Sequence, residues 1–234
     1  MQRPQHALAV TLHVRPYRET SVLLDLWLRE QGRFSAVARG VRAAGKARRF
    51  AELGPLALNL LELAGTGSVL SLRSHDTQRQ FPLAGPMGLR SALYLNELLL
   101  RLLPEHDPHP DLFDRYVQML AEWSARPQST AADYATSLRL FECALLEEIG
   151  YGLVWEQTID GDPVLPDVSY QVDPEQGVVA TRRGLDWPTI DGAALLALST
   201  GEPDARLASK ALRDLMRGIL RFRLGGRMLR AWVQ

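Results

Sequence analysis

Cysteine is almost absent from this 234-residue sequence. The single residue Cys143 excludes an internal disulfide framework and a zinc site built from cysteines. Long apolar runs are also absent, because no stretch approaches the roughly 20 uncharged residues that span a bilayer. The first twenty residues lack the unbroken apolar core of a signal peptide. We therefore expect a cytoplasmic protein with no membrane partner.

A net charge is absent too, since 27 Lys and Arg residues balance 27 Asp and Glu residues. The charges are nevertheless segregated along the chain. Residues 1–80 hold 12 basic and 6 acidic residues, residues 81–205 hold 7 and 20, and residues 206–234 hold 8 and 1. Two basic ends therefore flank an acidic middle, which predicts two surfaces that attach to a polyanion.

The first 80 residues carry the alternating pattern of β-strands. Leu8, Val10, Leu12 and Val14 alternate and are predicted to share one face of a strand. Further strands are predicted at residues 22–28, 33–41, 56–60 and 68–74, with no helix between them. Five short strands predict a closed barrel, and the five-stranded oligonucleotide-binding fold (OB-fold) is the leading candidate. An SH3-like barrel remains the alternative.

Helical periodicity begins after Pro82 and the Gly85-Pro86 pair, so residues 1–80 and 81–234 are predicted to be separate domains. Helices are expected at residues 89–103, from Asp111 as a cap, from Thr130 to Gly150, and from about 189 and 203 onward. Residues 152–188 interrupt this pattern with strand-like runs at 169–172 and 178–181. The predicted fold class is α+β: an amino-terminal OB-fold barrel followed by a helical-bundle domain with a small β-rich insertion.

A Gly- and Arg-rich loop follows the third predicted strand. Five cations lie within eleven residues that contain no acid: Arg39, Arg42, Lys46, Arg48 and Arg49. Phosphate contacts of this kind release counterions and give salt-sensitive affinity without sequence selection. We predict that this loop binds nucleic acid; a solvated surface loop is the alternative.

Residues 40–47 also match a phosphate-loop pattern, except that Ala47 stands where a Ser or Thr would hold magnesium. Alanine cannot ligate a metal, so the prediction of a nucleotide hydrolase is weak on chemical grounds. No other catalytic motif stands out, and we expect no enzymatic activity and no cofactor. His106, Asp107, His109 and Asp111 could be imagined as metal ligands, but an interhelical turn is the better interpretation.

Aromatic side chains could add base stacking to the barrel. Trp27 falls opposite Val22, Leu24 and Leu26, so it could be exposed beside Arg29. Packing in the core or at a sheet edge is the alternative for Trp27, Tyr17 and Phe34.

The carboxyl-terminal helix carries the second basic signal. Arg206, Lys210, Arg213, Arg217 and Arg221 recur every three or four residues and fall within an arc of about 80°. The opposite side is predicted to pack and consists of Ala208, Leu212, Leu215, Ile219 and Phe222. A phosphate backbone or an acidic protein tail is the expected ligand, and an anionic membrane surface is the less favoured alternative.

Short motifs occur in a characteristic order from about residue 5 to about residue 230. They are Arg15-Pro16-Tyr17-x-Glu19-Thr20-Ser21, Gly32-Arg33, Val37-Ala38-Arg39-Gly40-Val41-Arg42, Tyr94-x-Asn96-Glu97-Leu98-Leu99, Leu112-Phe113-x-x-Tyr116, Leu138-Arg139-x-Phe141-Glu142-x-x-Leu145-Leu146, Gly150-Tyr151-Gly152 and Leu224-Gly225-Gly226. In this order the chain resembles the RecO family of bacterial recombination mediators.

The resemblance implies binding to single- and double-stranded DNA, annealing of complementary strands, and action with RecR. It also implies contact with the acidic carboxyl-terminal tail of single-strand-binding protein, which lets RecA replace that protein on DNA. Many family members hold zinc with four cysteines in the β-rich insertion. Residues 152–188 contain none, so zinc is not implied here, and what stabilises the insertion is left open.

Two sets of residues follow from these interpretations. Arg139, in the Leu-Arg-x-Phe element, is the candidate cation for the acidic tail. The predicted DNA contacts are Arg33, Arg39, Arg42, Lys46, Arg48, Arg49, Lys210, Arg213, Arg217 and Arg221. The competing hypothesis is a protein-interaction scaffold whose basic ends bind acidic partner segments.

Overall fold

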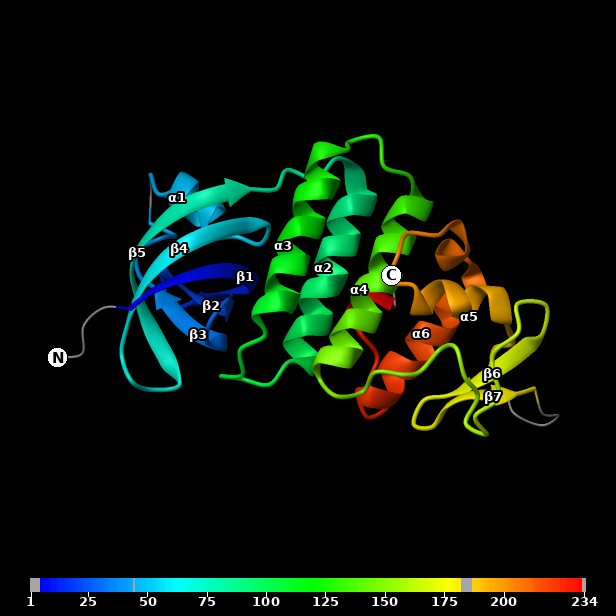
Figure 1. The fold of residues 1–234 in the computed structure, drawn as a ribbon. Coiled ribbons are helices and arrows are strands. Elements are labelled where there is room, and N and C mark those ends of the chain that lie inside the picture. The colour runs from blue at the N-terminus through cyan, green and yellow to red at the C-terminus, as the bar shows by residue number, and fades with distance from the viewer. Residues whose placement is uncertain (1–4, 44, 182–186, 233–234) are drawn as a thin grey trace. The chain divides into compact units, whose positions relative to one another are not determined.

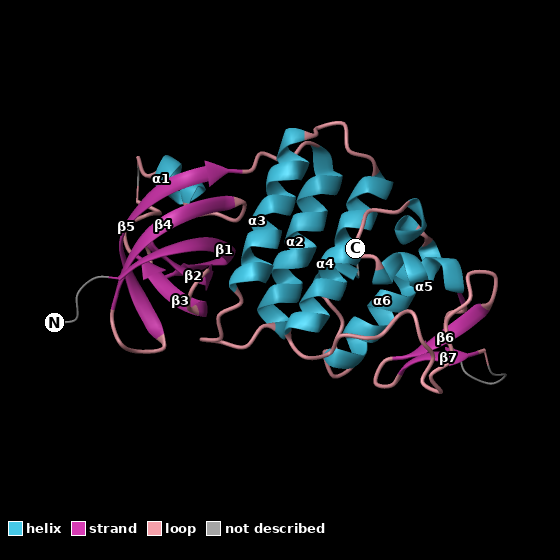
Figure 2. Cartoon of the chain, in the orientation of Figure 1, coloured by secondary structure: helices cyan, strands magenta, loops and turns pink. Residues whose placement is uncertain are grey.

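The structure is a computed structural model that describes residues 5–43, 45–181 and 187–232. It contains two compact units, one extending to Pro127 and the other beginning at Gln128 (Figures 1 and 2). The first unit contains β1 (Gln5–Tyr17), β2 (Ser21–Leu28), β3 (Gly32–Ala38), α1 (Ala47–Glu52), β4 (Ala57–Ala64), β5 (Val69–Gln80), α2 (Gly85–Leu102) and α3 (Pro110–Ala125). The second contains α4 (Ala131–Glu148), β6 (Ser169–Asp173), β7 (Gly177–Ala180), β8 (Ile190–Asp191), α5 (Gly192–Ser199) and α6 (Lys210–Arg223), with 3₁₀ turns at Ala205–Ala208 and Arg230–Trp232.

The five amino-terminal strands form a closed barrel in the order β1-β2-β3-β5-β4, and β4 pairs with β1 to complete it. All neighbouring strands are antiparallel except β3 and β5, which pair in parallel. The helix α1 connects β3 to β4 (Figure 1). This arrangement confirms the predicted OB-fold. The expectation that no helix separates the strands was wrong, because α1 is only six residues long and too short to show a period.

The prediction that Leu8, Val10, Leu12 and Val14 share one face was also wrong. The β1–β2 register shifts between Thr11 and His13, and this bulge reverses which side chains point inward. Before the bulge, Ala7 and Ala9 belong to the cluster that fills the barrel; after it, Val14 packs against that cluster. Val10 and Leu12 are buried outside the barrel interior.

The fourth strand has the opposite register from the one predicted. Residues Leu56, Leu58 and Leu60 were expected to define it, but the fully buried positions are the odd-numbered ones, including Leu61 and Leu63. Leu60 is 38% exposed, and Leu56 precedes the strand. A strand rich in leucine on both faces has no clear alternation, so the sequence does not fix its register.

Helices α2 and α3 lie in the same compact unit as the barrel. The Asn96 amide donates to the Leu12 carbonyl (3.0 Å), and the Tyr116 hydroxyl donates to the Asn96 side-chain oxygen (2.5 Å). Burial raises the pKa of Tyr116, which therefore stays protonated. Arg29, which follows β2, donates two hydrogen bonds to the Asp114 carboxylate on α3, and this lowers the pKa of Asp114. Polar contacts therefore fasten both helices to the barrel strands.

Trp27 is fully buried within this unit. Its ring packs edge-on against Phe113 at 5.2 Å and lies 5.8 Å from Tyr116. The base-stacking role considered for Trp27 is therefore excluded by burial, and the packing alternative is confirmed. Phe34 is partly buried against the barrel core, whereas Tyr17 is 37% exposed.

Local signals in the second unit predicted α4 well. Thr130 accepts a hydrogen bond from the Asp133 backbone, and the Asp133 carboxylate accepts one from the Thr130 backbone, so the two residues form a capping box. At the other end, Gly150 has φ +81° and donates to the Glu147 carbonyl. Tyr151 donates to the Leu146 carbonyl at 2.7 Å, so the helix ends in a Schellman motif.

The insertion contains the two predicted strands as β6 and β7. Several of its apolar side chains are buried: Trp155, Val164, Tyr170, Val172, Val178 and Val179. The Tyr170 hydroxyl accepts from the Leu165 backbone at 2.9 Å, and the Gln171 amide donates to the Trp187 carbonyl at 3.2 Å. A small apolar core and side-chain hydrogen bonds therefore stabilise this segment.

The last long helix begins later than predicted. Residues from about 203 were expected to be helical, but Ser209 caps α6 by accepting from the Leu212 backbone. Arg206 therefore lies on the preceding 3₁₀ turn and not in the row of cations on α6. Among the described helices, none has the length and apolar composition needed to cross a bilayer.

Candidate nucleic-acid interface

The basic loop after β3 leaves three cations exposed. Arg39, Arg42 and Lys46 are all solvent-accessible. Gly40 and Gly45 adopt φ of +69° and +78°, which favour glycine and let the loop fold tightly. No hydrogen bond or ion pair joins the three cationic groups to other described side chains. They are therefore available to an external anion.

This loop lies beside the turn between β1 and β2. The Arg42 backbone N–H donates to the Thr20 carbonyl at 2.9 Å, and the Lys46 N–H donates to the Ala43 carbonyl at 3.1 Å. The first bond holds the loop at the end of the barrel where β1 turns into β2, and the second closes a turn within the loop. We call Arg39, Arg42 and Lys46 the basic loop cluster.

The basic loop cluster adjoins an outward-facing cavity on the barrel. The cavity has a volume of about 350 Å³ and is lined by Tyr17, Arg18, Ser21, Val37, Arg39, Val69, Leu70 and Ser71. The Arg18 guanidinium lies 5.2 Å from the centre of the Tyr17 ring. The sequence pattern leaves the place of Tyr17 open and does not single out Arg18 or Val69. The signal that was missed is the alternation of side chains along β1. Tyr17, which pairs with Ser21, lies beyond the bulge in β1, and the bulge determines on which face of the strand Tyr17 lies.

Farther along the same face, charges are already compensated. Arg15 donates to Asp25 at 2.9 Å, His13 lies 3.4 Å from the same carboxylate, and the Ser35 hydroxyl also donates to it. Asp25 therefore offsets the positive charge of Arg15. The uncompensated charge is concentrated at the end with the loop.

Three other predicted DNA contacts in the barrel, Arg33, Arg48 and Arg49, are not part of the basic loop cluster. Arg33 is half-buried and donates to the Leu103 carbonyl at 2.9 Å, and burial lowers its pKa. Its guanidinium is thus engaged within the protein, which disfavours the predicted DNA contact. Arg48 and Arg49 belong to α1, but their side chains lie outside the described ones.

The phosphate-loop interpretation gains no metal ligand from the structure. Residue 44 lies outside the described residues, and Ala47 begins the short helix α1. Elsewhere, His109 is buried 3.5 Å from Asp107, and Asp111 lies in the first turn of α3 rather than capping it. Within the described residues no group of three or more His, Cys, Asp or Glu is placed to hold a metal ion. Burial raises the pKa of the Cys143 thiol to about 12, so this sulfur is not a thiolate at neutral pH.

The predicted row on α6 is exposed but partly paired. Lys210 donates to Asp214 at 2.5 Å, which lowers the pKa of Asp214, and Arg213 lies 3.6 Å from the same carboxylate. Arg221 donates to the Gly226 carbonyl at 3.3 Å. Arg217 is exposed and has no partner among the described side chains. The row therefore keeps a net positive charge of about three at its surface, since one carboxylate faces four cations.

The predicted packing face of α6 is confirmed except at Ala208 and Phe222. Ala208 is half-buried and lies on the preceding 3₁₀ turn. Leu212, Leu215 and Ile219 are buried, and Met216 and Leu220 are buried with them. Phe222, which was predicted to pack, is 46% exposed. It lies in the last turn of the helix, at the edge of a groove.

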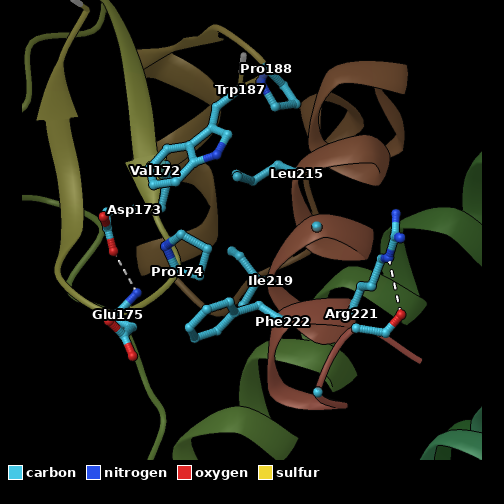
Figure 3. A pocket seen from close by; sticks show the side chains of 13 residues that line it. Val172, Asp173, Pro174, Glu175, Trp187, Pro188, Leu215, Ile219, Arg221 and Phe222 are labelled. Carbon is cyan, nitrogen blue, oxygen red and sulfur yellow. Dashed lines mark hydrogen bonds between the residues drawn. The ribbon is translucent and has the colours of Figure 1, made fainter. Parts of the chain in front are cut away.

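This groove lies between α6 and the segment that joins β6 to β7 (Figure 3). Its volume is about 660 Å³, and the lining residues are Val172, Asp173, Pro174, Glu175, Trp187, Pro188, Leu215, Gly218, Ile219, Arg221, Phe222, Gly225 and Gly226. A side-chain atom added at Gly218 would meet nothing within 4 Å, so the helix is open there. The floor is mostly apolar, while Arg221 and Glu175 place opposite charges at its margins. We call it the α6 groove.

Arg139 is not the exposed cation that an acidic tail would need. It is 4% exposed and donates to the buried Glu142 carboxylate at 2.5 Å, one helical turn along α4. The sequence hid this because an (i, i+3) pair of opposite charges usually lies on a helix surface. The candidate partner residue Arg139 therefore has a structural place in the core of the second unit.

Family models match both parts of the chain. The model described as Recombination protein O N terminal matches residues 1–81, and Recombination protein O C terminal matches residues 89–230. A protein of Halorhodospira halophila named DNA repair protein RecO is 37% identical over 239 residues, covering 99% of this chain and 96% of that protein. Proteins of the same name from Xanthomonas campestris pv. campestris and Ralstonia nicotianae are each 35% identical, and this chain covers 94% and 79% of their lengths.

Proposed function

The chain belongs to the RecO family of DNA repair proteins, and we propose that it serves repair and recombination by binding DNA without catalysing a reaction on it. The ligands are single- and double-stranded DNA, and the outcome is annealing of complementary strands. The observation that carries this proposal is the basic loop cluster: three exposed cations, unpaired among the side chains that the structure describes, at one end of an OB-fold barrel. Barrels of this fold commonly bind oligonucleotides near the loop that follows β1.

Annealing follows from charge placement. Two complementary strands repel each other because each carries one negative charge per nucleotide. The basic loop cluster would neutralise one strand, and the exposed cations Lys210, Arg213, Arg217 and Arg221 on α6 would neutralise another. Once both backbones are neutralised, base pairing proceeds without a chemical step.

The proposed partners are RecR, single-strand-binding protein and, indirectly, the RecA filament. We assign the acidic tail of single-strand-binding protein to the α6 groove. Apolar side chains of the tail would contact Ile219 and Phe222, and its carboxylates would meet Arg221. Glu175 at the opposite margin would repel the acidic part and so fix the direction in which the tail enters.

Fluorescence anisotropy with labelled single-stranded oligonucleotides tests the proposal. Three phosphate contacts in the barrel alone predict an affinity loss of about 20-fold between 50 and 200 mM salt, because each contact contributes about 0.7 to the logarithmic slope. A strand-annealing assay should weaken in parallel. Absence of binding at both salt concentrations would contradict DNA binding.

The scaffold hypothesis remains the second candidate, and the α6 groove is the feature that favours it. A scaffold would bind acidic partner tails there but would bind no oligonucleotide at low salt. The two candidate functions therefore predict different results in the anisotropy experiment, whereas both predict that an acidic tail binds in the α6 groove.

Filling the groove separates tail binding from DNA binding. We expect Gly218→Leu to lower affinity for the carboxyl-terminal peptide of single-strand-binding protein at least about tenfold, because the leucine side chain takes the space of an apolar anchor. Affinity for single-stranded DNA should stay within about twofold, because the barrel is untouched. Gly218→Ala is the matched control, since it adds one methyl group and is a better helix former. Unchanged peptide affinity in Gly218→Leu would place the tail elsewhere.

A further inference from the structure

The cavity beside the basic loop cluster combines exposed apolar and aromatic side chains with positive charge. Its volume of about 350 Å³ lies at the low end of the range of about 300–1,000 Å³ for small-molecule pockets. It is walled by the β1–β2 turn, the end of β3 and the start of β5. Those three segments come from separate parts of the chain and are joined by the barrel's hydrogen bonds, so the pocket is preformed.

The wall of the cavity offers flat and apolar groups. Tyr17 is 37% exposed, and Val69 is 47% exposed. The Arg18 guanidinium, 5.2 Å from the Tyr17 ring centre, adds a second planar group and a positive charge. Aromatic rings and guanidinium planes are the groups on which nucleobases stack, whatever the base.

The polar groups of the wall are uncharged or cationic. Ser21 and Ser71 supply hydroxyl groups, each of which can donate or accept a hydrogen bond at the edge of any base. Arg39 lines the same cavity and belongs to the basic loop cluster. No acid lines the cavity; Glu19, in the adjoining turn, is exposed.

We propose that this cavity, the base pocket, takes one unpaired nucleobase while the basic loop cluster holds the flanking phosphates. The inference rests on the proposed function and adds a preference to it. A base within a duplex is paired and stacked on both sides, so it cannot enter without the cost of unpairing. The base pocket would therefore make the barrel favour single strands over duplexes of equal charge.

The position of the base pocket next to the basic loop cluster supports this assignment. Arg39 belongs to both sets, and the bond between the Arg42 N–H and the Thr20 carbonyl fixes the loop beside the turn that carries Arg18. A nucleotide whose base enters the pocket therefore has its own phosphate next to the cluster. The base and the phosphate of one nucleotide of a single strand can therefore be bound at the same time.

Abasic oligonucleotides test the base pocket directly. A strand with normal bases and a strand of equal length built from abasic residues carry the same charge, so only contacts to the bases distinguish them. We expect the wild-type protein to bind the normal strand about tenfold more tightly. Tyr17→Ala should lose that difference, while Tyr17→Phe, which keeps the ring, should retain it. Affinity for a blunt duplex should change less than twofold in both variants.

A second readout reports on the base itself. The fluorescence of 2-aminopurine in a single strand should be quenched on binding to wild-type protein and to Tyr17→Phe, but not to Tyr17→Ala. Unfolding midpoints of the three proteins should agree, because Tyr17 lies at the exposed end of β1. Equal affinity of wild-type protein for normal and abasic strands overturns the base pocket alone. Absence of binding to either strand overturns the proposed function and the base pocket with it.

Discussion

Replacing Arg39, Arg42 and Lys46 together with glutamine is expected to weaken binding to single-stranded DNA about 100-fold at 0.1 M salt. Each phosphate contact on a single strand contributes about 0.7 to the logarithmic salt slope, which at 0.1 M equals about fivefold in affinity. Three independent contacts therefore multiply to about two orders of magnitude, and the slope should fall by about two. Salt titrations followed by anisotropy measure both quantities.

The basic loop cluster makes this variant informative because its cations have no internal role. All three are exposed and unpaired among the described side chains, so their removal should leave the unfolding midpoint unchanged. Glutamine keeps the aliphatic stem and a polar end. Lost affinity therefore reports lost charge at this place.

A matched control separates local charge from total charge. Arg90, Arg101 and Arg115 are exposed on α2 and α3, and replacing them with glutamine removes the same three charges. This control should lower affinity less than about threefold, since charges distant from the bound strand are screened by salt. Equal losses in the two triple variants would show that the loop is no specific contact.

The barrel could be predicted from the sequence because its features are local. Alternating residues in β2, a Gly-rich turn before β5 and short strand lengths together indicate a small closed sheet. The errors lie where local patterns are uninformative. A one-residue bulge at Thr11 to His13 inverts the face of β1, and no residue type marks it.

The candidate site was only partly predictable for a different reason. Trp27 and Tyr17 both point away from the barrel interior, yet Trp27 is covered by α3 and Tyr17 is exposed. Phe113, which covers Trp27, lies 86 positions later in the sequence, so local alternation carries no trace of the contact. Exposed loop cations were predictable because a charge run without acids has no local partner.

Arg139 shows the same limit for charged residues. The motif that contains it led to the expectation of a surface contact, but the helix α4 buries both Arg139 and its (i, i+3) partner Glu142. Which face of a helix packs depends on what packs against it. The amphipathic pattern of α4 is weak, with buried and exposed positions around much of its circumference, so sequence could not assign the face.

Glu142→Ala is expected to lower the free energy of unfolding by about 3–5 kcal/mol, because it leaves the Arg139 guanidinium buried without its carboxylate. Urea denaturation followed by circular dichroism measures this change. The exposed pair of Lys210 and Asp214 is the control, and Lys210→Ala should cost less than about 1 kcal/mol.

The double variant Arg139→Met with Glu142→Leu distinguishes a buried ion pair from a binding residue. Removing both charges together should restore most of the lost stability, since neither partner is then left uncompensated. If Arg139 instead bound the acidic tail, the double variant would be stable but unable to bind the peptide. Because Arg139 is only 4% exposed, we expect the double variant to recover both properties. Acidic-tail recognition would then depend on a cation that reaches the surface, such as Arg221 at the α6 groove.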